Sequence, residues 1–171
     1  MAIGSEVVPY VKAEHDRTDF RCGEESLDAF LREQITQLQR DGGTRAYVLC
    51  EDERRVIGYY TLNMFSVESA EAPADMQKGK YAIPAVLLGR LAVDERYAGK
   101  GLGVRLLVDA FVKSVNAASL VGARMMVVDA LHEQAAAFYV KQGFTAFEAN
   151  PLKLYLPMQH LRRTLEVAGR L

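Results

Sequence analysis

A glycine-rich stretch in the middle of the chain constrains the fold more than any other feature. Residues 96–103 read Arg-Tyr-Ala-Gly-Lys-Gly-Leu-Gly and follow a long apolar run at 85–93 that is typical of a strand buried on both faces. An apolar stripe at helical spacing comes next, formed by Leu102, Leu106, Leu107, Ala110 and Phe111. A glycine turn that ends a strand and opens a helix leaves backbone N–H groups free at the positive helix end, which favours a phosphate.

The glycine spacing by itself allows two interpretations. It does not match G-x-G-x-x-G, and the chain has no G-x-x-x-x-G-K-[ST], so a dinucleotide fold and a P-loop are both disfavoured. A tight surface turn with incidental glycines explains the spacing about as well as a phosphate site does.

A second informative stretch lies downstream. Residues 123–130 read as another buried strand, and the Ala-rich segment that follows reads as a short helix stopped by Gly143. This helix carries Phe138-Tyr139 shortly before Gly143-Phe144. Together with R-x-x-G-x-G at Arg96, Gly99 and Gly101, the pair resembles the GNAT superfamily of N-acetyltransferases, which transfer acetyl from acetyl-CoA to an amine.

The resemblance extends to a narrower group over roughly residues 8–158. The segments that carry it are Phe20-Arg-Cys-Gly23, Leu27-Asp-Ala-Phe-Leu31, Ile57-Gly-Tyr-Tyr-Thr-Leu62, Pro84 and Gly89-Arg-Leu-Ala-Val-Asp94. They are similar to the acetyltransferase toxins of toxin–antitoxin pairs, which acetylate the α-amine of aminoacyl-tRNA and block translation. The resemblance implies tRNA as the acceptor, a homodimer, and a ribbon–helix–helix antitoxin as partner.

The order of expected elements predicts the fold class. A helix at 24–39 is followed by a strand pair at 46–50 and 56–65, the strand and helix around the glycine turn, the strand at 123–130, a helix from 133, and a strand ending at 157; residues 161–167 form either a final helix or a frayed tail. This order predicts an α/β sheet with helices on both faces, in one domain over residues 1–171. The resemblance adds a GNAT-like, mostly antiparallel sheet whose splayed strand pair holds CoA.

Composition and charge indicate where the protein acts and which ligands it attracts. No apolar run approaches eighteen residues and no secretion signal is evident, so we expect a cytoplasmic protein without a membrane span. Two cysteines and three histidines lie scattered, and no metal site is expected. Net charge is −1, but residues 76–105 carry +4 and residues 151–171 carry +3, while residues 1–31 carry −4. An anionic ligand is steered toward the glycine turn, although CoA phosphates alone could account for the central cluster.

The resemblance assigns the cofactor residues. The pantetheine arm is expected on the amides of Leu91, Ala92 and Val93. The pyrophosphate is expected at the turn, with Arg96, Ala98, Gly99, Lys100, Gly101, Leu102 and Gly103. Tyr139 is the candidate general acid, because a phenol with an ordinary pKa near ~10 stays protonated and can donate to a departing thiolate. A tyrosine packed in the core through its ring is the alternative.

The sequence says less about the amine substrate and the residues that bind it. An α-amine, with a pKa near ~8, is partly neutral at pH 7 and needs less help from a base than a lysine amine does. Arg90 lies inside an apolar strand, so either it pairs with an acidic neighbour or it faces an open cleft and contacts an anionic substrate. Further basic candidates for tRNA phosphates are Lys78, Lys80, Lys100, Arg162 and Arg163.

Other functions stay open at this point. An enzyme that acetylates a small amine or a protein N-terminus, and a non-catalytic CoA-binding module, fit the same fold. Many superfamily members carry Asn near the start of the last catalytic helix, where this chain has Leu131-His132-Glu133, so one cofactor contact is in doubt. Tyr59 and Tyr60 alternate on a strand, so we expect one in the core and the other in the acceptor cleft or solvent.

Overall fold

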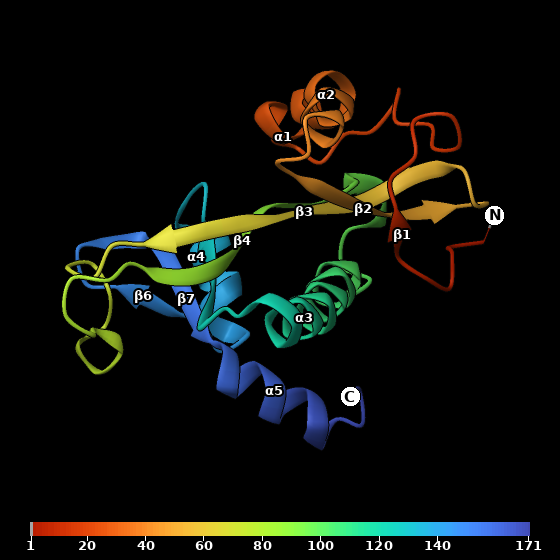
Figure 1. The fold of residues 1–171 in the computed structure, drawn as a ribbon. Helices are drawn as coiled ribbons and strands as arrows, with labels where there is room; N and C mark the ends of the chain where they lie inside the picture. Colours follow the sequence, from red (N-terminus) through yellow and green to blue (C-terminus); the bar gives the residue numbers. More distant parts are fainter. Residues whose placement is uncertain (1) are drawn as a thin grey trace. The chain divides into compact units, whose positions relative to one another are not determined.

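The computed structural model describes residues 2–171, which fall into two compact units. The first unit comprises Met1–Asn63 and Gly89–Ala110, and the second comprises Met64–Leu88 and Phe111–Leu171. Three elements run from one unit into the other: β3 (Arg55–Val67), β4 (Ile83–Val93) and α3 (Leu102–Val121). Figure 1 shows the course of the chain through them.

The strands follow the order β1-β2-β3-β4-β5-β7-β6 in a mostly antiparallel sheet, as expected. The remaining strands are β1 (Val8–Pro9), β2 (Arg45–Glu51), β5 (Met125–Asp129), β6 (Thr145–Phe147) and β7 (Asn150–Pro157). β4 and β5 pair in parallel, which suits two strands joined by a crossover helix. β1 and β6 were not predicted, because strands of two and three residues are too short to show a periodic pattern.

The helical segment predicted at 24–39 is confirmed in the first unit, with one irregularity. It consists of α1 (Glu25–Ala29), a π-helical turn η1 (Phe30–Gln34) and α2 (Ile35–Arg40). A single π turn inside an α-helix is rare and shifts the side chains that follow it around the helix axis. The apolar side chains of this segment pack into a core with β2, β3 and β4 whose members include Phe30, Leu31, Ile35, Val48, Val56, Tyr59 and Ala92.

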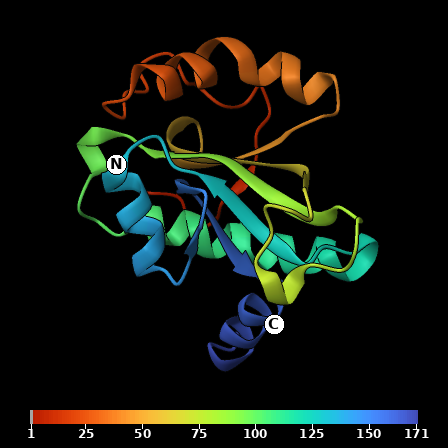
Figure 2. The same cartoon turned by 90° about the vertical axis from the view of Figure 1, so that its left-hand side faces the viewer.

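Consecutive residues of β3 face opposite sides of the sheet in the first unit. The Tyr59 hydroxyl donates to the Leu27 carbonyl at 2.7 Å on one side, and the Tyr60 hydroxyl donates to Asp109 Oδ2 at 2.5 Å on the other. The α1–α2 segment therefore covers one face and the first turns of α3 the other, which confirms helices on both faces of this unit (Figures 1 and 2). The expectation that one tyrosine reaches a cleft or solvent is wrong, because each hydroxyl meets a covering helix and both side chains are fully buried.

The second unit has its own apolar core around β5. Its members are Val67, Ala72, Met76, Ile83, Ala85, Met125, Val127 and Phe147. α4 (Glu133–Lys141) confirms the predicted helix that carries Tyr139. The final segment is a helix rather than a tail, α5 (Met158–Val167), because Met158, Leu161 and Leu165 form a buried stripe along it. Among the described residues, none of the helices has the length and apolar character needed to cross a membrane.

Candidate active site

The glycine turn forms a row of backbone donors without acceptors. Gly99 and Gly101 both have φ of 75°, a left-handed conformation that favours glycine. Within residues 2–171, the N–H groups of residues 99–104 donate to no protein acceptor, and the first N–H captured is that of Arg105, which bonds the Gly101 carbonyl at 3.1 Å. Six consecutive free N–H groups at the positive end of a twenty-residue helix form a strong site for an anion.

Asp94 holds this turn in place. Its carboxylate is fully buried and accepts the N–H groups of Arg21 (3.2 Å) and Arg96 (3.0 Å), together with Nε (2.8 Å) and Nη2 (2.7 Å) of the Arg96 side chain. Burial alone would raise the pKa of Asp94, but the hydrogen bonds from Arg96 and Arg21 outweigh it and hold the pKa below its ordinary value. Asp94 is a functional residue that was not predicted from the sequence. A polar residue directly after a buried strand and two residues before the Arg of R-x-x-G-x-G was the available signal.

The side-chain donors of Arg96 are occupied by acceptors within the protein. Besides its contacts with Asp94, its Nη1 donates to Asp19 Oδ2 at 3.2 Å and its Nη2 to the Asp19 carbonyl at 3.2 Å. The Ala98 N–H donates to the Glu95 carbonyl at 3.3 Å, within the short turn η3 (Glu95–Tyr97). The N–H groups of Arg96 and Ala98 are therefore occupied, and the free donors begin at Gly99. A direct contact between the Arg96 side chain and a phosphate stays a prediction.

The end of β4 carries the other predicted cofactor residues. The pairing of β4 with β5 ends at Leu88 and Val128, and β4 continues for five more residues to Val93. Leu91 and Val93 are partly exposed, while Ala92 packs into the core of the first unit. The β4–β5 pairing thus ends three residues before the segment to which the resemblance assigns the pantetheine arm, and that assignment stays a prediction.

Arg90 has no ion-pair partner among residues 2–171, so of its two alternatives the pairing with an acidic neighbour is not observed. Its guanidinium carbon lies 3.6 Å from the centroid of the Phe30 ring, at the start of the π turn. Burial lowers the pKa of Arg90, an effect that Tyr59 partly opposes. A half-buried cation supported by an aromatic face has a fixed orientation and unused N–H groups.

Tyr139 lies on α4 in the second unit and packs through its ring, while its role as general acid stays a prediction. Its ring packs edge-on against Phe138 and Phe144, with centroid distances of 5.2 and 5.5 Å. Its hydroxyl has no hydrogen-bond partner within the described part of the chain, and burial raises the pKa of the phenol, which therefore keeps its proton. His132 caps the same helix, because its Nδ1 accepts the Ala135 N–H at 3.2 Å. The cofactor contact left open at Leu131-His132-Glu133 stays untested.

The predicted residues are divided between the units. The glycine turn, the end of β4 and Arg90 belong to the first unit, and Tyr139, Arg162 and Arg163 belong to the second. Arg162 and Arg163 are exposed on α5, and Lys78 and Lys80 are exposed in the segment before β4. No group of three or more His, Cys, Asp or Glu side chains in residues 2–171 is arranged to hold a metal ion.

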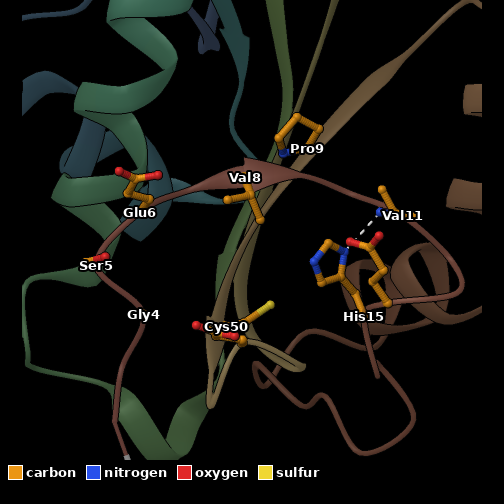
Figure 3. A pocket seen from close by; sticks show the side chains of 10 residues that line it. Gly4, Ser5, Glu6, Val8, Pro9, Val11, His15 and Cys50 are labelled. Atoms are coloured by element: carbon orange, nitrogen blue, oxygen red, sulfur yellow. Dashed lines mark hydrogen bonds between the residues drawn. The ribbon is translucent and has the colours of Figure 1, made fainter.

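A pocket of about 490 Å³ in the first unit contains none of the predicted site residues. It is lined by Gly4, Ser5, Glu6, Val8, Pro9, Val11, Glu14, His15, Cys50 and Glu53 (Figure 3). His15 Nδ1 accepts the Val11 N–H at 2.9 Å, and burial lowers the pKa of His15, so the ring stays neutral. With three carboxylates and no cation in its lining, this pocket repels phosphates and is unsuited to CoA or tRNA.

A comparison with protein-family models finds a family that matches this chain, and the matched residues include the glycine turn. Residues 43–146 match the acetyltransferase (GNAT) domain. The chain belongs to the GNAT acetyltransferase family. This protein is therefore an acetyl-CoA-dependent N-acetyltransferase, with acetyl-CoA as its co-substrate.

Three proteins of known activity or structure are similar to this chain over most of its length. A tRNA-acetylating toxin of Mycobacterium tuberculosis (strain ATCC 25618 / H37Rv) is 43% identical over 148 residues, which is 86% of this chain and 89% of that protein. The toxin AtaT complexed with acetyl-methionyl-tRNAfMet superposes with a TM-score of 0.85 at 33% identity, over 96% of this chain and 99% of that one. A Tyr-to-Phe mutant of AtaT bound to acetyl-CoA and the C-terminus of the antitoxin AtaR has a TM-score of 0.82 at 32% identity, covering 94% and 97%.

Replacing Gly101 with Val tests the row of free N–H groups. A β-branched residue disfavours a φ of 75°, and left-handed geometry costs an L-residue about 1–2 kcal/mol, so acetyl-CoA affinity should fall roughly 5- to 30-fold. Titration calorimetry on the folded variant measures this. Gly122→Val is the matched control, because Gly122 has a φ of 81° at the far end of α3 and should leave affinity unchanged. Unchanged acetyl-CoA affinity in a folded Gly101→Val protein would contradict the assignment of the pyrophosphate to this turn.

Replacing Asp94 with Asn tests the anchor of the turn. The change removes the charge that receives the Arg96 guanidinium, and it should lower the free energy of unfolding by about 2–3 kcal/mol, since Arg96 is partly solvated. Asp19→Asn is the control, because that carboxylate contacts Arg96 from the solvent side and should cost less than about 1 kcal/mol. Urea unfolding compares the two. Equal losses would mean that the buried carboxylate does not organise the turn.

Proposed function

We propose that this protein is a toxin that transfers acetyl from acetyl-CoA to the α-amine of aminoacyl-tRNA in the cytoplasm and so blocks translation. The observation that carries the proposal is the near full-length likeness to a tRNA-acetylating toxin. The likeness to AtaT complexed with acetyl-methionyl-tRNAfMet supports the same acceptor. The unpaired, half-buried Arg90 at the end of β4 adds a feature that suits an anionic acceptor.

The residues of this chain have distinct tasks in the transfer. The free N–H groups of residues 99–104 bind the pyrophosphate, and the amides of Leu91, Ala92 and Val93 align the pantetheine arm. The neutral α-amine attacks the thioester carbonyl carbon, a C–N bond forms, and the C–S bond breaks. The amine releases a proton to water, and the CoA thiolate takes the hydroxyl proton of Tyr139, which is later replaced from solvent. Burial raises the pKa of Tyr139, so the phenol is protonated when the thiolate forms.

The proposal extends to domain organisation and partners. Residues 1–171 act as one acetyltransferase domain, because three secondary-structure elements run through both units and the family match takes in residues of each. AtaT binds the C-terminus of its antitoxin, which supports an antitoxin for this chain, and we propose one of the ribbon–helix–helix type. We also propose that the protein pairs into a homodimer, as the toxin resemblance implies.

The acceptor assay decides the proposal. Labelled acetyl should transfer to a pool of charged tRNAs and much less to polyamines, free amino acids or peptides. Affinity for tRNA should fall steeply with salt, because phosphate contacts release counterions. Arg162→Glu, on the exposed basic pair, should weaken tRNA binding more than acetyl-CoA binding, whereas Arg54→Glu, beside the acidic Glu53, should change neither. Robust labelling of a small amine, with none on charged tRNA, would contradict the proposal.

Tyr139→Phe separates the acid role from the packing role. The ring contacts with Phe138 and Phe144 are kept, so acetyl-CoA binding should stay nearly intact while turnover falls roughly 10²- to 10⁴-fold. Steady-state kinetics on charged tRNA measures the loss. Tyr155→Phe, in the same unit, is the matched control and should retain full turnover. Wild-type turnover of the Tyr139 variant would leave that residue with a packing role only.

A further inference from the structure

Arg90 is held in one orientation without any anion to receive its charge. Its guanidinium carbon lies 3.6 Å from the Phe30 centroid, a distance at which the planar group lies against the ring face. Within residues 2–171 none of its five N–H donors meets an acceptor. Arg96, by contrast, is paired with Asp94 and Asp19. Arg90 is therefore arranged for an anion that the protein itself does not supply.

Phe30 is itself fixed in place. Its ring is 1% exposed, and it lies nearly parallel to the ring of Tyr59, with centroids 6.3 Å apart and an interplanar angle of 12°. The Tyr59 hydroxyl is anchored on the Leu27 carbonyl. The support under Arg90 is thus rigid, and a rigid planar fork favours bidentate contact with a phosphate over a loose ionic contact.

The position of Arg90 along β4 selects which phosphate it reaches. Arg90 directly precedes the Leu91–Val93 segment where the thioester is aligned, and a strand rises about 3.3 Å per residue, so the two lie within roughly 3–10 Å along the strand. In an aminoacyl-tRNA, eight covalent bonds separate the α-amine from the phosphorus on the 5′ side of the terminal adenosine, an extended span of about 9 Å. The next phosphate of the chain lies a full nucleotide further away.

We propose that Arg90, supported by Phe30, binds the 5′-phosphate of the 3′-terminal adenosine of the acceptor and thereby places the α-amine beside Leu91–Val93. This inference rests on the proposed tRNA acceptor and deepens it. Arg90 is a substrate-binding residue that recognises the nucleotide common to all tRNAs, so it confers preference for the aminoacyl end over free amino acids and peptides without choosing the amino acid. A phosphate of acetyl-CoA is the other source of the same chemistry, and the test includes it.

Two stable acceptors isolate the contact. Both are adenosines that carry an amino acid through a 3′-amide with a free α-amine, one with a 5′-phosphate and one without. With wild-type protein, the phosphate should raise kcat/KM about 10- to 100-fold, the range expected for a charge-assisted bidentate contact. In Arg90→Gln this advantage should disappear, so that the ratio of the kcat/KM values for the two acceptors falls to about one. Arg90→Lys, which keeps the charge but loses the fork, should retain only part of the advantage.

The controls separate the possible failures. Arg54→Gln, on an exposed turn, should keep the wild-type phosphate advantage, and the Kd for acetyl-CoA should be the same in Arg90→Gln as in the wild type. A full phosphate advantage in Arg90→Gln overturns the inference and leaves the tRNA acceptor standing. If Arg90→Gln loses as much acetyl-CoA affinity as activity, the inference is also overturned, because Arg90 then binds a phosphate of CoA. Absence of any wild-type transfer to charged tRNA overturns both the inference and the proposed function.

Discussion

The buried carboxylate of Asp94 is the interaction on which the cofactor side of this protein depends. It collects four hydrogen bonds from Arg21 and Arg96 at the point where β4 ends, and it does so without exposure to water. Beyond Arg96 the free N–H groups begin at Gly99 and continue through Gly101 into the start of α3. An internal ion pair thus precedes the free N–H groups, and these neutral donors are where we propose that the phosphate binds.

The opposite arrangement holds at Arg90, three residues before the end of the same strand. Here the protein leaves a cation unpaired and supports it with an aromatic ring instead of a carboxylate. The π turn that begins at Phe30 is the local irregularity that accompanies this contact. We propose that the two sites receive different anionic ligands. The neutral N–H groups after β4 bind the cofactor, and the unpaired cation of Arg90 binds the acceptor.

Most of the fold followed from the sequence because its longer elements carry clear periodic patterns. The strand, glycine turn and helix from residue 85 onward, and the helix that carries Tyr139, appear where they were expected. The short strands β1 and β6 and the π turn could not be predicted, since two to five residues hold no period. The partners of charged side chains were equally hidden: Arg90 and Arg96 look alike in the sequence, yet only Arg96 has carboxylates folded against it. Of the two partners of Arg96, Asp94 lies two residues away, but Asp19 is distant in the sequence and no local pattern predicts its contact.

Amide hydrogen exchange on the glycine turn tests the central claim, which is that the N–H groups of residues 99–104 bind the CoA pyrophosphate. In the free protein these amides lack acceptors and should exchange fast. Saturating CoA should slow their exchange strongly, whereas pantetheine, which has no pyrophosphate, should not. Protection of these amides by CoA alone is the predicted result. Fast exchange at residues 99–104 in the CoA-saturated protein, or equal protection by pantetheine, would contradict the account.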